Sequence, residues 1–184
     1  MGRAEYQDLT EVCLKQKRIY QGKVFRVEQD EVRLPNGLTG SREVVRHPGA
    51  VGILALKEEK ILLVRQYRYA LGRETLEIPA GKLDWGEEPE VCAIRELREE
   101  TGYQGKVEKL GEIATSPGFT DEIIHLYRAA DLVWAPLTTD DDEFINVESV
   151  PLAEAAEQAR RGEITDAKTA LAILLGLNDF AKRL

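Results

Sequence analysis

The sequence predicts an α+β or layered α/β/α domain preceded by a short β arm. Apolar runs of strand length recur between residues 24 and 130, whereas helical composition is confined mainly to 88–101 and to the region after 150. These segments lack the regular strand–helix alternation of a doubly wound parallel sheet. A chain of 184 residues with 43% hydrophobic content fits one domain with one substantial core.

The arm is expected to span residues 1–47. Apolar and polar residues roughly alternate over 24–34, and Pro35-Asn36-Gly37 is a turn signal before a returning strand at 42–46. A two-stranded hairpin is marginal in water, so the arm should pack on the main body or on a second subunit.

The main domain is expected to span residues 48–184. Apolar runs at 50–56 and 61–67 flank a turn-like segment and predict an antiparallel pair. Further strands are expected at 74–79, 106–114, 123–130 and 144–150. Pro89 and Gly102 predict the two ends of a helix over 88–101. Two more helices are expected at 151–161 and 166–182.

Composition excludes several classes of protein. The net charge of -8 argues against a nucleic-acid partner but allows a small anionic substrate if a metal ion reverses the local charge. Cys13 and Cys92, both expected to be half-buried, form no CxxC motif, which indicates a cytoplasmic protein without disulfides. No signal peptide and no apolar run of membrane-spanning length is visible.

Three carboxylates share one side of the helix expected at 88–101. Glu96 and Glu100 lie one turn apart, and Glu99 falls within the same third of the circumference. Like charges this close repel one another, and a hard divalent cation that prefers oxygen ligands would reverse the sign of the interaction. Arg95, one turn before Glu99, could orient that carboxylate.

The opposite side of the same helix is expected to anchor it to the sheet through Val91, Ile94 and Leu97. An isolated acidic pattern on a helix is usually just a solvated face. Here it belongs to a longer pattern: Gly81, five residues, Glu87, seven residues, Arg95-Glu96-Leu97, one residue, Glu99-Glu100, one residue, Gly102-Tyr103. At ordinary residue frequencies such identities coincide on the order of once in 10⁸ positions.

Residues 81–103 therefore resemble the Nudix box at every defining position. The resemblance implies an α/β/α sandwich around a mixed sheet, with the box as a loop–helix–loop, and metal-assisted hydrolysis of a nucleoside diphosphate linked to another group. It implies that Glu96 and Glu100 bind Mg²⁺ directly, with Mn²⁺ able to substitute. Glu99 would be a further ligand or assist the attacking water, Gly81 would shape the loop, and the Ala80 carbonyl would complete a coordination site.

Segments outside the box resemble bacterial ADP-ribose pyrophosphatases, which yield AMP and ribose 5-phosphate. These segments are 34–37, 42–45, 47–51, 64–68, 77–81 and 116–119, the last containing the subfamily marker Pro117. Among the cationic side chains suited to phosphate contacts, Arg68 is favoured because it follows a strand that leads toward the box. The other expected phosphate and ribose contacts are Arg42, Arg46, Lys82, Ser116, Pro117, Gly118 and Glu122.

The same resemblance implies a homodimer with exchanged N-terminal arms and with adenine at the subunit boundary. On this chain the adenine contacts would be Val24 and Phe25 with Arg42 and Glu43. Some relatives have an aromatic side chain where this chain has Val24, so Phe25, Tyr20 or the guanidinium of Arg42 would stack on the base instead.

A late acidic loop supplies the general base in related enzymes, and the candidate here is 140–143. Glu143 is favoured, and Asp141 is the alternative.

Two alternatives to ADP-ribose hydrolysis remain: a Nudix hydrolase of other nucleotide sugars or of nucleoside triphosphates, and a binding module without catalysis. The complete glutamate set argues against the binding module. No P-loop and no HExxH motif is present, and His47 and His125 are expected to be structural.

Overall fold

The computed structural model describes residues 7–139 and 143–181, the last four through their backbone alone. The chain divides into two compact units, which are considered separately. Unit 1 comprises Met1–Pro48 and Ala114–Glu122, and unit 2 comprises Gly49–Ile113 and Ile123–Leu184. Within the described residues, no helix is long and apolar enough to cross a membrane.

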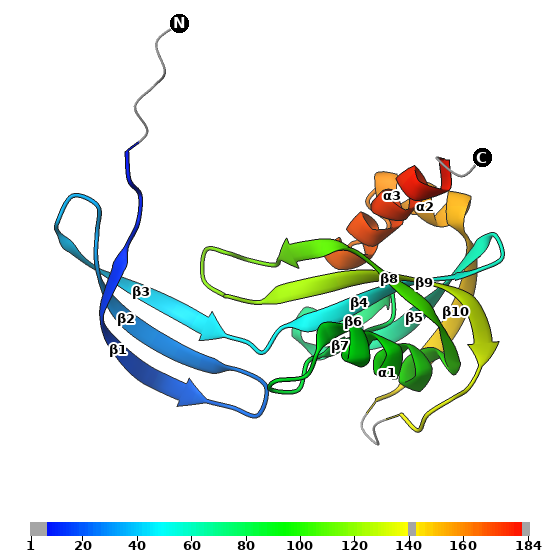
Figure 1. The fold of residues 1–184 in the computed structure, drawn as a ribbon, viewed down its shortest axis with the longest axis horizontal. Coiled ribbons are helices and arrows are strands. Elements are labelled where there is room, and N and C mark those ends of the chain that lie inside the picture. Colours follow the sequence, from blue (N-terminus) through cyan, green and yellow to red (C-terminus); the bar gives the residue numbers. More distant parts are fainter. Residues whose placement is uncertain (1–6, 140–142, 182–184) are drawn as a thin grey trace, which may run out of the picture. The chain divides into compact units, whose positions relative to one another are not determined.

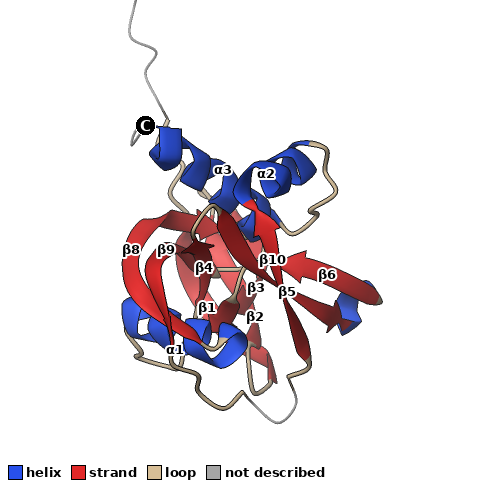
Figure 2. Cartoon of the chain, turned by 90° about the vertical axis from the view of Figure 1, so that its right-hand side faces the viewer, coloured by secondary structure: helices blue, strands red, loops and turns tan. Residues whose placement is uncertain are grey.

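Unit 1 contains a three-stranded antiparallel sheet in the order β1-β2-β3, labelled in Figure 1 and, from another direction, in Figure 2. Its strands are β1 (Val12–Gln21), β2 (Arg26–Arg33) and β3 (Thr39–Arg46). The predicted hairpin around Pro35-Asn36-Gly37 is confirmed as β2 and β3, and Gly37 takes a φ of +82° in the turn. The expectation of only two strands is wrong, because β1 adds a third. All ten β1 residues are exposed, so β1 lacks the buried face that produces an alternating pattern.

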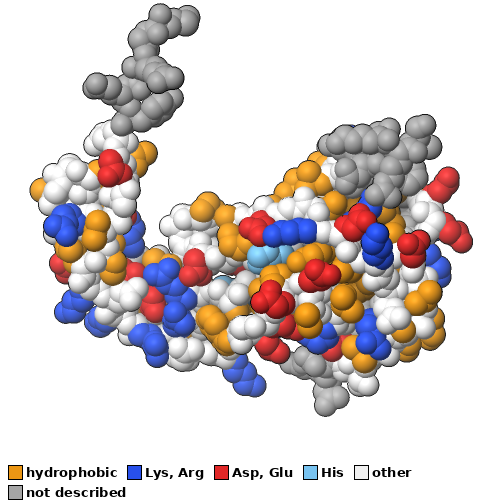
Figure 3. All heavy atoms as spheres, viewed as in Figure 1, with side chains coloured by type: hydrophobic (Ala, Val, Ile, Leu, Met, Phe, Trp, Pro, Cys, Tyr) orange, Lys and Arg blue, Asp and Glu red, His pale blue; other side chains and the backbone are white. Residues whose placement is uncertain are grey.

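Apolar side chains lie at the surface of unit 1 among lysines and arginines (Figure 3). They are Leu9, Val12, Leu14, Ile19, Tyr20, Val24, Phe25 and Leu38. Cys13 is also exposed, so the expectation that it is half-buried is wrong, because β1 has no buried face. The segment 114–122 joins this unit through its backbone, since the Val45 amide donates to the Phe119 carbonyl at 2.7 Å and Val45 bridges Thr120.

Unit 2 is built on a seven-stranded sheet in the order β10-β5-β4-β9-β8, with β6 paired to β5 and β7 to β4. The strands are β4 (Ala50–Lys57), β5 (Lys60–Arg68), β6 (Arg73–Glu77), β7 (Ala80–Lys82), β8 (Tyr103–Ala114), β9 (Ile123–Trp134) and β10 (Ile145–Pro151). A short 3-10 helix, Tyr69–Leu71, joins β5 to β6. The pair β4–β9 is parallel and the pairs β4–β5, β5–β6 and β5–β10 are antiparallel, so the predicted mixed sheet is confirmed.

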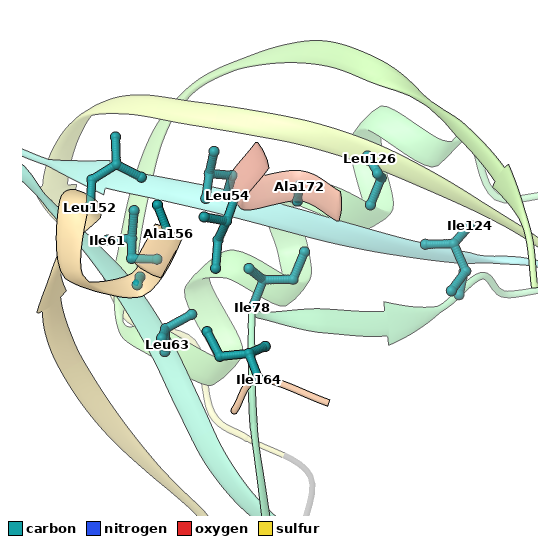
Figure 4. Packing of buried hydrophobic residues seen from close by; sticks show 13 residues of the cluster. Leu54, Ile61, Leu63, Ile78, Ile124, Leu126, Leu152, Ala156, Ile164 and Ala172 are labelled. Carbon is teal, nitrogen blue, oxygen red and sulfur yellow. The ribbon is translucent and has the colours of Figure 1, made fainter. Parts of the chain in front are cut away.

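Helices cover both faces of this sheet (Figure 2). In β4, Val51 and Ile53 face the cluster that includes Leu97 of α1 (Pro89–Thr101). The next residue, Leu54, faces the opposite cluster, formed with α2 (Leu152–Arg160) and α3 (Ala167–Ala181) and shown in Figure 4. Both faces of β4 are therefore buried, which explains its continuous apolar sequence. The expected α/β/α sandwich is confirmed.

The packing face of α1 differs from the expected one. Val91 is 58% exposed and Ile94 is half-buried, whereas Cys92 and Ala93 are buried together with Leu97. At 100° per residue, Val91 lies on the side of the helix opposite Ala93 and Leu97. The buried face extends to Glu96 and Glu100, which the sequence alone placed on a face turned away from the sheet.

Candidate active site

The box begins with a close approach between backbone and carboxylate. A Cβ atom on Gly81 would lie 1.9 Å from the carboxyl carbon of Glu96. Even alanine would therefore displace this side chain or the strand β7 that carries Gly81. Gly81 thus leaves room for Glu96 of the helix, which gives a physical basis for its expected role in shaping the loop.

The loop between β7 and α1 is closed by Glu87. Its amide donates to the Asp84 carbonyl at 3.0 Å, and its Oε2 accepts from the Asp84 amide at 3.0 Å. The same carboxylate accepts from Nε and Nη2 of Arg95 at 3.1 and 3.0 Å. Glu87 therefore fixes both the loop and the arginine of the helix.

Arg95 binds two further carboxylates through Nη1, which donates to Glu96 Oε1 at 2.7 Å and to Glu99 Oε2 at 2.9 Å. The arginine thus contacts Glu99, as expected, and also two glutamates that it was not expected to contact. Three negative charges share one cation, so the group remains short of positive charge.

Glu100 joins the helix to the box loop, because its Oε2 accepts from the Ala80 amide at 2.8 Å. Burial raises the pKa of Glu100 to about 8; the Ala80 amide opposes this rise, and the carboxylates of Glu96 and Glu143 add to it. Burial likewise raises the pKa of Glu96 to about 7, against the attraction of Arg95.

The donor set fits a divalent cation in its chemistry. In Glu96, Glu99 and Glu100, one carboxylate oxygen accepts a hydrogen bond, and the second has no hydrogen-bond donor among the described residues. Open carboxylate oxygens are ligands that hard cations prefer. Within the described part of the chain, no three acidic, histidine or cysteine side chains already converge as a metal site, since Arg95 draws Glu96 and Glu99 to itself.

Glu143 lies close to the same carboxylates, since its charge raises the pKa of both Glu96 and Glu100. Strand β10 begins at Ile145, which lies opposite Gln66 of β5. Glu143 is two residues before this strand, and its charge effects on Glu96 and Glu100 are what place it beside the box. Asp141, the alternative candidate, is outside the described residues.

Arg68 ends β5 and is bound side-on by Glu77, with Nε to Oε1 at 2.8 Å and Nη2 to Oε2 at 2.6 Å. Its charge opposes the rise in the pKa of Glu100, which places it near the carboxylate face of α1. Lys82, at the end of β7, is exposed, and its carbonyl faces Arg95 Nη2 at 3.5 Å.

A hollow of about 680 Å³ in unit 1 brings together several of the expected substrate contacts. It is lined by Glu11, Ser41, Arg42, Glu43, Val44, Arg46, Pro117, Gly118, Phe119, Thr120 and Asp121. Ser116 closes the adjoining turn, where its carbonyl accepts from the amides of Phe119 and Thr120, both at 3.1 Å. Glu122 accepts from the Thr115 hydroxyl at 2.8 Å and lies 3.4 Å from Nδ1 of His47.

The two arginines of this hollow already have partners within unit 1. Arg42 is bound side-on by Glu11, with Nε to Oε2 at 2.9 Å. Arg46 donates through each of its three nitrogens to carboxylates of the same unit, at distances of 2.8 to 3.3 Å. Val24 and Phe25 do not line the hollow; each is about two-fifths exposed, and Phe25 packs against Tyr20 at a ring-centre distance of 5.9 Å.

Comparison with known proteins bears on the family. The model of the NUDIX domain matches residues 46–171, and that of the nucleoside diphosphate sugar hydrolase N-terminal domain matches residues 11–45. This chain belongs to the Nudix family. Nudix hydrolases generally use divalent metal cations, in agreement with the open oxygens of the box glutamates.

Among its Nudix relatives, the ADP-ribose pyrophosphatase of Bacillus subtilis is 46% identical over 91% of this chain and 92% of the relative. A protein named methanol dehydrogenase activator, from Bacillus methanolicus, is 47% identical over 89% of this chain and 90% of its own length. A GDP-mannose pyrophosphatase from Cronobacter sakazakii is 40% identical over 70% of this chain and 77% of the relative. A crystal structure described as an ADP compounds hydrolase shares the fold, with a TM-score of 0.85, 22% identity and coverage of 97% and 98%.

Sequence reasoning assigned no role to three residues that the structure places in these sites. Glu87 was part of the Nudix spacing, but its bonds to Arg95 depend on the loop fold. Glu77 lies in the segment 77–81, but its ion pair with Arg68 depends on the antiparallel pairing of β5 with β6. Phe119 is 56% exposed and lines the hollow of unit 1. Its backbone pairs with Val45, which is far away in the sequence, so the sequence alone did not indicate this position.

Proposed function

We propose that this Nudix protein hydrolyses the pyrophosphate bond of ADP-ribose to AMP and ribose 5-phosphate. The observation that carries the proposal is the 46% identity, over 91% of the chain, to a relative named for this activity. The complete set of Glu96, Glu99 and Glu100, held by Arg95 and the Ala80 amide, supports catalysis rather than binding alone.

Glu96 and Glu100, with the Ala80 carbonyl, would hold Mg²⁺, for which Mn²⁺ could substitute, and Glu99 would bind it or orient the attacking water. The bound cation supplies charge neutralisation at the phosphates and a lower pKa for water. Arg95 keeps Glu96 and Glu99 on one side of the helix. Arg68 contacts a phosphate of the substrate, where a guanidinium donates in a fixed plane.

Glu143 acts as the general base. Its carboxylate takes a proton from water as the water oxygen bonds to phosphorus, the bridging P–O bond breaks, and the electron pair leaves with the departing phosphate oxygen. Its proximity to Glu96 and Glu100 supports this role, and Asp141 is the competing candidate. Glu143→Gln and Asp141→Asn, assayed separately, decide between them, because loss of a base costs about 10²–10⁴-fold in rate.

The hollow of unit 1 would bind the nucleoside and ribose ends. Arg42 and Glu43, with Val24 and Phe25 from the same unit or from a second copy, would contact adenine. Ser116, Pro117, Gly118 and Glu122 would border the terminal ribose, with Arg46 and Lys82 as further cationic contacts. The grouping of five of these residues in one hollow supports this assignment.

A homodimer with exchanged N-terminal arms would cover the exposed apolar side chains of β1, since large unpartnered patches of this kind usually mark interfaces. Sedimentation velocity of the wild-type chain and of Ile19→Glu tests it, with Val133→Glu as a control on an exposed apolar residue of β9. A wild-type monomer would reject the dimer. We place the reaction in the cytoplasm because both cysteines are free.

The deciding experiment is a panel of nucleoside diphosphate compounds and nucleoside triphosphates with Mg²⁺, with the products identified. AMP with ribose 5-phosphate as the preferred outcome supports the proposal. Preference for a sugar nucleotide would instead favour the second candidate, a nucleotide-sugar hydrolase, to which the matched N-terminal domain and the GDP-mannose pyrophosphatase relative point. No turnover of any compound, with retained binding, would indicate a binding module.

A further inference from the structure

Two strands of unit 2 end in a pair of oppositely charged side chains beside the box. Arg68 is the last residue of β5 and Glu77 the last residue of β6, and the strands run antiparallel. The carboxylate of Glu77 takes one hydrogen bond on each oxygen from Arg68, at 2.8 and 2.6 Å. A planar guanidinium bound through two nitrogens has its plane fixed, which a single bond would not achieve.

Glu77 is itself held from two further sides. The Thr75 hydroxyl donates to Oε1 at 2.6 Å, and Nζ of Lys168, on α3, donates to Oε2. Glu77 is only 2% exposed. Burial raises its pKa, but hydrogen bonds from Arg68 and the charge of Lys168 outweigh burial and hold the pKa at about 2. Glu77 is therefore an ionised anchor whose own position is fixed.

Residues at the start of α3 hold Lys168, which binds Glu77, and the backbone next to Glu77. Asp166 Oδ2 accepts from Lys168 Nζ and from the Thr169 amide, both at 3.0 Å. The buried hydroxyl of Thr169 accepts from the Ile78 amide at 2.8 Å. Ile78 directly follows Glu77 and leads to the box, so α3 fixes both the anchor and the backbone beside it.

The opposite edge of the Arg68 guanidinium is left free by Glu77. Its Nη1 donates to none of the residues that the structure describes, and the side chain is 40% exposed. After Glu77, the negative charges that raise the pKa of Arg68 are those of Glu100, a proposed metal ligand, and Asp166. Without Glu77, the arginine would have a carboxylate of the reaction centre as its best remaining partner.

We propose that Glu77 is a positioning residue for the reaction, which holds Arg68 away from Glu100 with its Nη1 edge turned toward a phosphate of the substrate. The inference rests on the proposed function in that it takes a diphosphate as the ligand of Arg68. Glu77 touches neither substrate nor metal, and it acts through the arginine.

A double-mutant cycle tests this. Glu77→Gln, Arg68→Met and the double variant are compared in kcat/KM with the nucleoside diphosphate that the wild-type chain cleaves best. Each single change should lower kcat/KM by about 10- to 100-fold, largely through KM, because the phosphate contact is misplaced or lost. The double variant should be no more than about threefold worse than Arg68→Met. Multiplied losses, or an unaffected Glu77→Gln, would overturn the proposal.

Two control variants separate positioning from stability. Lys168→Met removes another buried partner of the same carboxylate but keeps both bonds to Arg68, so Tm should fall while kcat/KM stays within about threefold. Glu148→Gln removes the other arginine–glutamate pair of β5, in which Arg65 Nε lies 2.5 Å from Glu148, and should leave kcat/KM unchanged. If Lys168→Met lost as much activity as Glu77→Gln, stability and not positioning would account for both losses.

If Glu77→Gln did not fold, Glu77→Asp would replace it, since it keeps the charge but withdraws the carboxylate from Arg68 by one methylene group. This change should lower kcat/KM in the wild-type chain and should not lower it further in Arg68→Met; equal losses in both would reject the proposal.

The affinity for ADP-ribose is also measured by calorimetry for every variant of the cycle. Absence of hydrolysis with every compound would thus reject the proposed function, while the affinities still decide the role of Glu77.

Discussion

Two arginines of this chain each bind three carboxylates, one at the box of unit 2 and one in unit 1. The Arg95 cluster comprises Arg95, Glu87, Glu96 and Glu99. The Arg46 cluster comprises Arg46, Glu28, Asp30 and Asp121. The first is drawn from one loop and one helix, whereas the second joins β2, β3 and the segment 114–122.

The two clusters differ in how well their charge is balanced. In the Arg46 cluster, the hydrogen bond from Arg46 lowers the pKa of Glu28. In the Arg95 cluster, burial raises the pKa of Glu96 to about 7 in spite of Arg95. Arg46 therefore stabilises the charge of Glu28 and joins strands of unit 1, although Oδ1 of Asp30 is buried without a hydrogen-bond partner among the described residues. Arg95 likewise lowers the pKa of Glu87 but leaves Glu96 in need of a further cation.

The largest effect is expected where the Arg95 cluster meets the backbone. Gly81→Ala would place a methyl group 1.9 Å from the Glu96 carboxyl carbon and displace it. We expect kcat/KM to fall by about 100-fold or more, since misplacement of about 1 Å at a reaction centre has such an effect. Gly111→Ala is the matched control, because no described heavy atom lies within 4 Å of its added Cβ. Full activity in Gly81→Ala would mean that the position of Glu96 is unimportant.

Arg95→Lys should have the next largest effect. A lysine is a point charge and cannot bind three carboxylates in the plane that the guanidinium provides. We expect kcat/KM to fall by about 10- to 100-fold with Tm changed little, as is usual when the residue that orients metal ligands is replaced. Steady-state kinetics over a range of Mg²⁺ concentrations, with Tm measured in parallel, would check this. A fall in Tm that accounts for the lost activity would contradict it.

The contrast between the clusters also explains what the sequence could predict of the site. Arg95, Glu96 and Glu99 lie on one helix, whose geometry relates them, so spacing alone indicated their chemistry. Glu87 lies in the loop before that helix, and its bonds to Arg95 required the structure. The partners of Arg46 are 16, 18 and 75 residues away, and strand register and a loop crossing bring them together. Arg46 was accordingly predicted to contact substrate from its charge, without knowledge of the three carboxylates around it.

The strands and helices also divide into those that the sequence predicted and those that it missed. Apolar β4 and β5 were predicted almost to their ends because burial on two faces gives a continuous pattern. Strand β1 was missed because it has no buried face, and β7 because three residues around Gly81 carry no periodicity. The orientation of α1 was predicted with Val91 inward because its buried carboxylates, Glu96 and Glu100, were taken as solvent-facing.

Replacement of arginine by lysine in the Arg46 cluster can be compared directly with Arg95→Lys. Arg46→Lys should cost about 1–2 kcal/mol, because Glu28 and Asp30 are nearly buried and lose hydrogen bonds to a charged donor. For a chain of this size that corresponds to a fall in Tm of roughly 3–6 °C, measured by calorimetry. An unchanged Tm with activity lost as in Arg95→Lys would mean that Arg46 acts through the substrate alone and does not hold the strands of unit 1 together, and the contrast would fail.

The raised pKa values of Glu96, in the Arg95 cluster, and of Glu100 beside it predict how stability responds to pH. The folded-state pKa of Glu96 and Glu100 is raised, so their contribution to stability is complete below about 4.5 and is lost as pH rises through about 7 and 8. In EDTA, Tm should therefore fall between pH 6 and pH 9. Mg²⁺ should raise Tm more at pH 8.5 than at pH 6, because protons compete with the cation for these oxygens. Glu100→Gln should lose most of this difference, and a shift by Mg²⁺ that is independent of pH would contradict the assignment.

The smallest effect is expected at the outer edge of the Arg46 cluster. Asp121 is 42% exposed in its side chain and lies 3.3 Å from Arg46, whereas Asp30 is 94% buried in its side chain at 3.1 Å. Exposed ion pairs contribute about 0–1 kcal/mol, and an asparagine can still accept from the His47 amide, which now donates to Asp121 Oδ1 at 2.9 Å. Asp121→Asn should therefore lower Tm by less than about 3 °C, and Asp30→Asn by more. The reverse order would show that attachment of the segment 114–122 to β3, and not the carboxylates of β2, accounts for the stability that Arg46 confers on unit 1.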